Sequence, residues 1–511
     1  MFSNKDISIL TEILEEINKN QNEAWAIYGT GDGAELVYIL LNQLSIANEI
    51  DSFIERDEKV YLNQKFHGIP VKKLTEVCDT VNRIIIAAID NHEIIRKRIK
   101  NSLSEEQAER IQVIDVFEEI VKKDRLQYLE YIEKNILKKS GEFVEFDSNG
   151  YKSNINDTKV IAWYLPQFHQ MEINNKYHGQ GFTEWTNTSR AIPLFTGHYQ
   201  PHIPYDVGYY DLLNPSTLKR QIYLARHYGV YGFCFYYYWF SGKRLMEKPL
   251  ELLLEHKELN MPFCINWATE NWTTLWDGGN KKVIVEQKLE ENDGQRFMES
   301  ILPYMKDPRY IKIDERPILV IYRVNIFEKE QVKLLLNNFR EIAKKSGFPD
   351  LYIMLSNAFN FRDNIIEWGA DALVEFPPHG TFDLLEVNKN LGYINPYFSG
   401  RIFDAQSFVE NKRYMADYGR QTYYRSALTS WDNTARKAMS DANIFCGLNP
   451  QTFKKWVKDI VDESKKIHSR SEDIIFVNSW NEWAEGSHLE PDMKYGYGYL
   501  QALKEALTEQ Q

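Results

Sequence analysis

The sequence has little cysteine and no excess of positive charge, and both absences exclude classes of protein. The four cysteines lie far apart, without the paired spacing of a zinc site; they are Cys78, Cys234, Cys264 and Cys446. We expect them to be reduced, buried thiols. With 61 basic and 73 acidic residues, the formal net charge is −12. This balance argues against nucleic acid or an anionic membrane as the main partner.

The sequence also lacks a signal peptide and a membrane span. Its first residues, MFSNKDISILTEILEEINKN, form an amphipathic helical pattern that carries acidic side chains, unlike a secretory leader. No apolar run is long enough to cross a bilayer. We therefore expect no transmembrane segment and a cytoplasmic location.

What the sequence does have is length and aromatic side chains. Its 511 residues, 43% of them hydrophobic, are enough for two or three domains with large cores. Aromatic residues make up 14% of the chain and cluster in its second half. Such enrichment suits stacking on sugar rings and equally suits packing of a large core, so composition leaves both open.

A glycine-rich turn near the N-terminus predicts a phosphate-binding fold. The segment EAWAIYGTGDGAELVYILL has the pattern of a short strand, a turn and a helix, and Gly29, Gly31 and Ala34 fit G-x-G-x-x-A. Glu55 ends a second strand at about the distance typical of a ribose-binding acid. Glycines in such a turn let the backbone approach a phosphate at a helix N-terminus.

Further apolar runs extend this pattern to a small Rossmann-like β-α-β domain over residues 1–118. The succession IYGTGDGAELVYILL, FIERDEKV, FHGIPVKKL and RIIIAAID resembles the nucleotide-sugar-binding domains of sugar acyltransferases and other polysaccharide-assembly enzymes. The resemblance implies a nucleotide sugar or dinucleotide as ligand. The alternative is a vestigial scaffold that binds nothing, and we find no residues that indicate a partner for hydride transfer.

A change in composition separates this domain from the rest of the chain. Residues 119–158 comprise a charged helix and a polar segment rich in Gly, Asn, Asp and Ser, typical of a linker. Over residues 159–511, eight apolar runs alternate with helical patterns, which predicts a (β/α)8 TIM barrel, an α/β fold. A doubly wound open sheet is the alternative. The predicted strands lie at 159–168, 229–239, 261–269, 316–323, 351–357, 371–376, 422–432 and 474–483.

The last of these strands ends in paired carboxylates flanked by tryptophans. In IIFVNSWNEWAEGSHLEPD, Glu482 and Glu485 are three residues apart, so both can face one pocket only if the chain turns after Trp483. Gly486 is well placed to allow that turn. One acid can protonate a departing glycosidic oxygen while the other acts as base or nucleophile, and indole faces stack on sugars. The simpler alternative is that both carboxylates only hydrogen-bond backbone in a loop.

Polar and aromatic side chains follow nearly every predicted strand. Because the active site of such a barrel lies at the carboxyl ends of its strands, we expect these residues to bind substrate. His169 is ambiguous between a ligand-facing base and a loop histidine, and for the pair His198 and His202 we favour a structural role over metal binding. The candidate substrate-binding residues are Tyr164, His169, Glu184, Trp185, Trp239, Asn266, Trp267, Glu270, Trp272, Trp276, Asp277, Tyr322, Arg323, Glu375, Trp431, Asp432, Asn481 and Trp483.

Seven motifs between residues 159 and 505 carry a family resemblance. They are KVIAWYLPQFHQ, GQGFTEWTNTSRA, GHYQPHIPYDVGYYDL, YGFCFYYYWFSGKRLMEKPL, INWATENWTTLWDG, TSWDNTAR and SWNEWAEGSHLEPD. Together they resemble the WbsX-type family of bacterial polysaccharide-biosynthesis proteins, often described as glycosyltransferases and related to glycoside hydrolase family 99, the endo-α-mannosidase group. The resemblance is more specific for family than for reaction.

The resemblance implies roles for two residues. In the hydrolase relatives the two catalytic carboxylates lie in an E-W-x-E segment, which matches Glu482 to Glu485 here. Those relatives cleave with retention through a 1,2-anhydro intermediate. By that resemblance Glu482 takes the proton of the sugar 2-hydroxyl, while Glu485 protonates the leaving oxygen and later activates the acceptor. Acid catalysis at neutral pH then requires a raised pKa at Glu485.

We therefore predict a carbohydrate-active enzyme that makes or breaks a glycosidic bond with retention, in the biosynthesis of a surface polysaccharide such as O-antigen or capsule. Its expected partner is a glycan, together with a nucleotide sugar; the barrel needs no cofactor, and no residues have the spacing of a metal site. The alternatives are a non-catalytic glycan-binding barrel and an NAD-dependent enzyme that modifies nucleotide sugars.

Overall fold

The computed structural model describes residues 4–19, 23–56, 64–88, 91–135, 138–274, 282–359, 361, 363–380, 384–387, 395, 397–437 and 441–509. The chain divides into two compact units, the first formed mainly by residues up to Glu133 and the second mainly by those from Lys134 on. Among the described helices, none combines the length and apolar character that crossing a membrane requires.

The N-terminal unit is built on a parallel sheet. Central strand β1 (Trp25–Tyr28) lies between β2 (Ile50–Ile54) and β5 (Arg83–Ile86), in the order β3-β4-β2-β1-β5-β6. The predicted strand, turn and helix are present, since β1 leads through the glycine turn into α2 (Asp32–Gln43). Only β3 and β4 pair antiparallel in this sheet as described. The remaining elements are α1 (Asn4–Asn18), β3 (Lys65–Phe66), β4 (Ile69–Lys72), α4 (Leu74–Val77), α5 (His92–Ser102), α6 (Glu105–Arg110), β6 (Gln112–Asp115) and α7 (Val116–Asn135).

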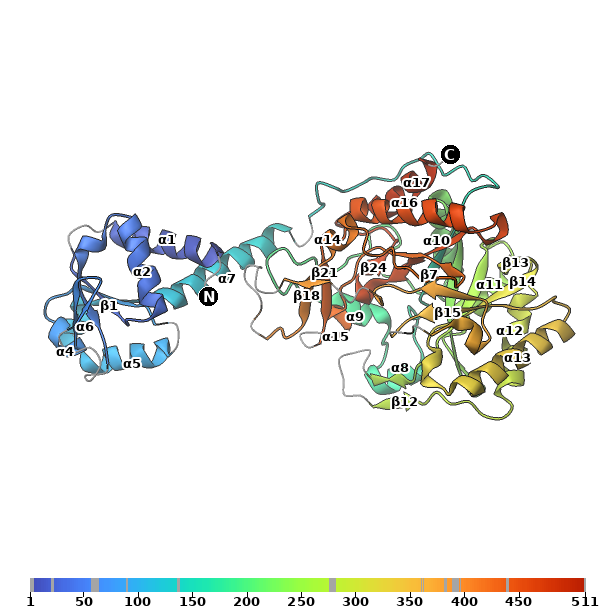
Figure 1. The fold of residues 1–511 in the computed structure, drawn as a ribbon, viewed down its shortest axis with the longest axis horizontal. Helices are drawn as coiled ribbons and strands as arrows, with labels where there is room; N and C mark the ends of the chain where they lie inside the picture. The colour runs from blue at the N-terminus through green and yellow to red at the C-terminus, as the bar shows by residue number, and fades with distance from the viewer. Residues whose placement is uncertain are drawn as a thin grey trace. The chain divides into compact units, whose positions relative to one another are not determined.

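The second unit is a nearly closed (β/α)8 barrel of parallel strands (Figure 1), so the predicted barrel is confirmed and the open sheet is wrong. The seventh strand is in two parts: β19 pairs with β16, and β20 pairs with β22. Because β22 also pairs with the first strand, β7, the sheet closes on itself apart from the break between β19 and β20. The eight strands fall where the sequence predicts them: β7 (Lys159–Tyr164), β8 (Val230–Phe240), β10 (Phe263–Trp267), β14 (Arg316–Ile321), β15 (Tyr352–Asn357), β16 (Ala372–Glu375), β19 (Tyr423–Tyr424) with β20 (Ser426–Leu428), and β22 (Ile474–Asn478).

An ion pair holds the barrel at the break in its seventh strand. Arg425, between β19 and β20, is 3% exposed and donates from Nη1 to Glu375 Oε1 at 2.7 Å. The other oxygen of Glu375 accepts the backbone N–H of Ser426 at 3.0 Å. A second carboxylate, Glu463, also binds the guanidinium. Glu375 therefore joins neighbouring barrel strands.

Outer helices cover the barrel, and two of them begin at a capping asparagine followed by proline. Asn449 accepts the N–H groups of Gln451 and Thr452, both at 3.0 Å, and Pro450 opens α16 (Pro450–Ile467). Asn214 and Pro215 start α10 (Pro215–His227) in the same way. The other covering helices are α11 (Lys248–Glu255), α12 (Asp293–Met305), α13 (Lys329–Lys345), α14 (Ala405–Glu410) and α17 (Gly498–Thr508).

Side chains alternate between the barrel interior and this helical layer. On β8, Tyr237 contacts the rings of Phe297 and Tyr304 on α12, whereas its neighbour Tyr236 contacts Trp163 and Phe376. On β10, Trp267 likewise stacks against Phe297. Much of the aromatic content thus serves as core, one of the two uses that composition allowed.

Three insertions lie beyond the carboxyl ends of the strands. The segment after β7 holds two short helices, and a small sheet follows β16. A hairpin follows β22. These elements are α8 (Glu172–His178), α9 (Glu184–Arg190), the sheet of β17 (Leu385–Glu386), β18 (Arg401–Asp404) and β21 (Asn443–Cys446), and the hairpin of β23 (Asn481–Glu482) and β24 (Ser487–His488).

The glycine turn of the N-terminal unit supplies a stability test. A Cβ on Gly33 would overlap the carbonyl oxygen of Ala87 and touch the ring of Phe117, so Gly33→Ala must push α2 away from the sheet. We expect a loss of roughly 1–3 kcal/mol. This loss of stability should be measurable in the full chain as faster amide hydrogen exchange in β1. The matched control is Gly31→Ala, where a Cβ meets nothing within 4 Å and φ is −92°. That change should shift stability by less than about 0.5 kcal/mol, and equal effects of the two variants would contradict the account.

Candidate active site

The two glutamates of the E-W-x-E segment lie on a turn at the end of the eighth strand. Glu482 closes β23, residues Trp483–Glu485 form a single 3-10 turn, and Gly486 reverses the chain with φ +64° before β24. The predicted turn after Trp483 is thus present. Because the chain turns there, the two carboxylates face the same way, and both line one cavity.

A buried carboxylate, Glu490, fixes this turn to the barrel. It is 1% exposed and accepts four hydrogen bonds, two of them from the indole N–H groups of Trp480 at 3.1 Å and Trp483 at 2.7 Å. Gln221 on α10 and the hydroxyl of Tyr210 donate the other two, at 2.7 and 2.8 Å. The tryptophans around Glu482 are therefore held by polar contacts as well as packing.

One arginine bridges three carboxylates at the site, of which Glu184 and Glu482 are buried and Glu485 is partly buried. Arg436 lies on α15 (Thr434–Lys437) and is 4% exposed. Its Nη2 is 2.9 Å from Glu482 Oε2, its Nη1 is 2.8 Å from Glu485 Oε1, and its Nε is 2.8 Å from Glu184 Oε1 on α9. Three acids and one base leave an excess of negative charge in a buried place, so the cluster favours binding a proton.

Small side chains allow these three elements to meet. Ala191 follows α9, Ala435 lies on α15 and Ala484 lies in the 3-10 turn, and the three form a separate buried cluster. Any larger side chain there would separate the helices from the turn and pull Arg436 from the glutamates. Glu485 is also tied by its carbonyl, which accepts the N–H of Asp432 at 2.7 Å.

Burial shifts the titration of both glutamates upward. It raises the pKa of Glu482 to about 8; Arg436 lowers that pKa, and the charge of Glu485 raises it further. Burial also raises the pKa of Glu485, against the same arginine. The raised pKa that acid catalysis requires is therefore present, and near neutral pH the pair retains a proton.

The cavity over these glutamates has a volume of about 1100 Å³ and mixes aromatic and charged walls. Arg323 is 2.6 Å from Glu270 and covers the ring of Phe359, while Tyr322 lies 3.2 Å from the Nε2 atom of His379. Such walls combine stacking surfaces with hydrogen-bonding groups that suit sugar hydroxyls. The predicted residues that line the cavity are Glu270, Trp272, Tyr322, Arg323, Trp431, Glu482 and Glu485.

Other predicted residues support the site from outside its walls. Asn481 is bonded to the backbone of Leu165, and Trp185 donates to the carbonyl of Tyr210. Asp432 accepts from Gln200 and is paired with His198, and this carboxylate has a pKa lowered to about 2. The predicted residues absent from the cavity wall are Tyr164, His169, Glu184, Trp185, Trp239, Asn266, Trp267, Glu375, Asp432, Asn481 and Trp483.

Several of these residues have clear structural surroundings. The hydroxyl of Tyr164 donates to Gln221 at 2.7 Å, and Trp267 donates to the carbonyl of Trp239 at 3.3 Å. Burial lowers the pKa of His169 to about 4, which keeps the ring neutral. The amide of Asn266 is fully buried, and within the described part of the chain neither of its polar atoms has a hydrogen-bond partner. Trp276 and Asp277 lie outside the described residues.

Some residues of the cavity are absent from the sequence prediction. Arg436 ends the motif TSWDNTAR, and its place after the seventh strand was a usable signal. The walls from the small sheet follow no barrel strand, so the strand-end rule misses them. The unpredicted wall residues include Tyr236, Phe376, His379, Arg401, Phe403, Arg436, Asn443 and Phe445.

In the N-terminal unit, the predicted ligand residues lie at the turn between β1 and α2. Gly29 has φ +115°, and a Cβ on Gly31 would meet nothing within 4 Å, so the turn is open above it. Glu55 Oε2 accepts the hydroxyl of Thr30 at 2.9 Å. Asp32 and Glu35 occupy the first turn of α2, where their charges oppose an incoming phosphate.

The buried glutamates generate a test of pH-dependent stability. The folded pKa of Glu482 lies above the usual value, so its destabilising effect is absent below about pH 4.5, grows as pH rises and is complete above about pH 8. Glu482→Gln should therefore melt at a higher temperature than the unmodified protein at pH 8 and near the same temperature at pH 5. We expect a difference on the order of a few kcal/mol.

Glu463→Gln is the control, for which we expect a change in stability of the opposite sign. Although burial raises the pKa of Glu463, hydrogen bonds from Arg425 outweigh it and lower that pKa. This substitution should therefore cost stability at pH 8 and cost less as pH falls through the range where the carboxylate protonates. A Glu482→Gln protein that is no more stable than the unmodified chain at pH 8 would show that burial does not raise this pKa.

Comparisons with known proteins agree with the motifs. The sequence profile of the family described as "Glycosyltransferase WbsX" matches residues 160–503, which include both glutamates and Arg436 and exclude the N-terminal unit. Two curated proteins, each called "Uncharacterized protein WxcX" and from two strains of Xanthomonas campestris pv. campestris, B100 and ATCC 33913, are each 36% identical over 352 residues. That alignment covers 68% of this chain and 49% of theirs, so the chain spans about half the length of these relatives.

Two solved structures are similar to this chain at low sequence identity. One is a "Glycoside hydrolase-like protein", 14% identical, with a TM-score of 0.45 over 72% of this chain and 98% of that one. Another is the GH99 endo-alpha-mannosidase from Bacteroides thetaiotaomicron, 13% identical, with a TM-score of 0.45 over 70% of this chain and 98% of that one. The family prediction rests on the motifs and the profile, and both place the chain in one group: it belongs to the WbsX glycosyltransferase family.

Proposed function

We propose that the barrel makes or breaks a glycosidic bond in the cytoplasm, during assembly of a cell-surface polysaccharide, with Glu482 and Glu485 as its acid–base pair. The observation that carries the proposal is that both carboxylates line one cavity of about 1100 Å³ and are joined by Arg436. Raised pKa values keep a proton in the pair near neutral pH, which a sugar leaving group requires.

The proposed chemistry proceeds in two halves with retention. In the first, Glu482 accepts the proton of the sugar 2-hydroxyl, whose oxygen attacks C1 as the bond from C1 to the leaving oxygen breaks, and Glu485 protonates that oxygen. In the second, Glu485 accepts the proton of the incoming hydroxyl, whose oxygen attacks C1. The bond from C1 to the 2-oxygen then breaks, and Glu482 returns the proton. Water in the second half gives hydrolysis, and a sugar hydroxyl gives transfer.

Arg436 supports both roles in this scheme. As a permanent cation between the glutamates, it stabilises whichever of them is ionised. Glu184 holds the guanidinium from its third side, so the arginine cannot follow either glutamate alone. Because burial raises the pKa of Glu482 to about 8, its use as a base predicts that activity increases as the pH rises toward 8 and falls once Glu485, the acid of the pair, loses its proton.

A product screen tests the function. We expect the unmodified protein to release or transfer sugar from α-mannosyl or related glycosides, with or without nucleotide sugars and acceptors, and with retention seen by NMR. Glu482→Gln and Glu485→Gln should each lower the rate by ~10²–10⁴-fold, because each removes one proton transfer. Glu505→Gln, a partly exposed acid on α17 paired with Lys454, is the control and should be as active as the unmodified chain. If all four proteins bind glycans and none turns them over, the chain is a glycan-binding barrel.

We extend the proposal to the N-terminal unit, where the turn at Gly29 and Gly31 binds a nucleotide sugar or dinucleotide. The open turn and the nearby carboxylate of Glu55 support it, whereas the acids at the start of α2 oppose it. Isothermal titration with uridine and guanosine diphosphate sugars and with NAD should detect binding in the unmodified chain. Glu55→Ala should weaken it by about 10-fold. No binding by the unmodified chain would make this unit a scaffold.

A further inference from the structure

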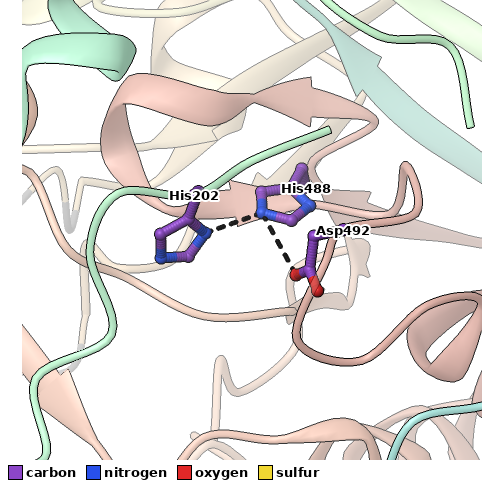
Figure 2. A group of neighbouring side chains, drawn as sticks. All are labelled: His202, His488 and Asp492. Atoms are coloured by element: carbon purple, nitrogen blue, oxygen red, sulfur yellow. Dashed lines mark hydrogen bonds and ion pairs between the residues drawn. The ribbon is translucent and has the colours of Figure 1, made fainter. Parts of the chain in front are cut away.

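Two histidines and an aspartate from separate segments converge in the interior of the barrel domain (Figure 2). His202 lies between α9 and α10, His488 ends β24, and Asp492 follows it by four residues. Their exposed fractions are 5%, 1% and 1%. None of the three lines the large cavity, so the group is distinct from the candidate active site.

The donor atoms of the three side chains face a common point. His202 Nδ1 is 2.8 Å from His488 Nε2, and that nitrogen is 3.7 Å from Asp492 Oδ2. All three atoms lie within 4.8 Å of one another. In Figure 2 both dashed lines meet at the Nε2 atom of His488, with the second imidazole on one side and the carboxylate on the other.

We propose that His202, His488 and Asp492 hold a divalent transition metal ion of the zinc type as a closed, structural site. Two imidazole nitrogens and one carboxylate oxygen are a common ligand set for such ions. Bonds of about 2.0–2.2 Å fit a triangle of this size after the two nitrogens separate by a few tenths of an ångström.

Hydrogen bonds to the outer atoms orient two of the ligands. The Nδ1 of His488 lies 2.9 Å from the carbonyl oxygen of Glu490, which can only accept, so Nδ1 carries the proton and Nε2 presents its lone pair inward. Asp492 Oδ1 accepts the N–H groups of Lys494 and Tyr495 at 2.9 and 2.6 Å. Metal ligands are typically oriented by such contacts.

One oxygen of the group still needs a partner. Asp492 Oδ2 is buried, and within the described residues it accepts no hydrogen bond. The hydroxyl of Tyr199 is also buried and has no hydrogen-bond partner within the described residues. The ring centroid of Tyr199 lies 4.1 Å from that of His202. An ion satisfies the carboxylate oxygen, and the phenol of Tyr199, which interacts with the side chain of Asp492, is the candidate for the fourth ligand.

The charged side chains around the group allow a second arrangement, in which no metal ion is bound. Lys494 is near Asp492, but its ammonium lies over the rings of Tyr199 and Tyr495, at 4.5 and 4.8 Å from their centroids. Burial is the main cause that lowers the pKa of this lysine. In the alternative without an ion, His202 donates to His488, and Lys494 is the nearby positive charge that offsets Asp492.

The site would act on the catalytic turn through His488. Its ring stacks on that of Trp483, with centroids 3.8 Å apart and planes 15° apart, and Trp483 separates the two candidate catalytic glutamates. An ion at His488 therefore anchors the hairpin in addition to the contacts that Glu490 makes. The sequence conceals this site because His202 and His488 are 286 residues apart.

Metal analysis of the full chain tests the proposal. Protein produced with zinc in the medium and then dialysed should contain about one equivalent of zinc by mass spectrometry. Substitution with Co²⁺ should give the visible absorption of a tetrahedral site, and a chelator should lower the melting temperature. Asp492→Asn keeps the shape and the Oδ1 acceptor, and this variant should lose the zinc, the cobalt bands and the chelator effect. His202→Ala should do the same.

The matched control is His256→Ala, which removes a partly exposed histidine paired with Glu258. It should retain the metal and the cobalt spectrum in full. Background zinc in the unmodified chain, with no cobalt bands and no response to chelator, would overturn the proposal. Zinc that persists in folded Asp492→Asn and His202→Ala proteins would overturn it too, because the metal would then lie elsewhere.

Discussion

The barrel domain depends on one buried carboxylate. Glu490 accepts four hydrogen bonds in a place that water does not reach, and two of its donors are the tryptophans on either side of Asn481 and Glu482. Burial raises the pKa of Glu490 to about 7 although all four donors lower it, so the loss of one donor would raise that pKa further and leave a buried polar group without its partner. The four donors hold the carboxylate of Glu490 in place. In turn, this carboxylate fixes the turn that carries Glu482 and Glu485.

At that turn, the guanidinium of Arg436 determines how negative charge is distributed among the three carboxylates that it contacts. Arg436 offsets only part of the charge of three acids, and burial penalises every carboxylate that stays ionised. The site therefore holds a proton through the balance of its own side-chain charges. This cost in stability accompanies the acid–base role that we propose for the pair, and Arg436 and Glu184 are as deeply buried as the barrel core.

Local patterns in the sequence predict the barrel well. Eight apolar runs mark the eight strands, and Asn449 with Pro450 marks the start of α16, because strands and helix caps depend on neighbouring residues. The turn after Trp483 follows in the same way from Gly486. The rule that strand ends form the site identifies Glu270, Tyr322 and Arg323 on the cavity wall.

The rule fails where a strand end has other partners. Glu375 binds Arg425 at the closure of the barrel, and Asp432 pairs with His198, contacts that join residues 50 and 234 positions apart. Trp239 and Trp267 face the helices because of strand alternation, which a one-residue shift in register would reverse. Patterns among neighbouring residues do not predict contacts between residues so far apart in the sequence. For the same reason they do not predict the small sheet that completes the cavity.

The most direct test of the central claim is a crystal structure of the Glu485→Gln protein with a bound α-mannoside or an oligosaccharide from the cognate polysaccharide. The account predicts a sugar ring in the cavity, with its 2-hydroxyl within hydrogen-bond reach of Glu482 and its glycosidic oxygen near the substituted side chain at position 485. A glycan bound elsewhere on the barrel, with the cluster around Arg436 left untouched, would contradict it.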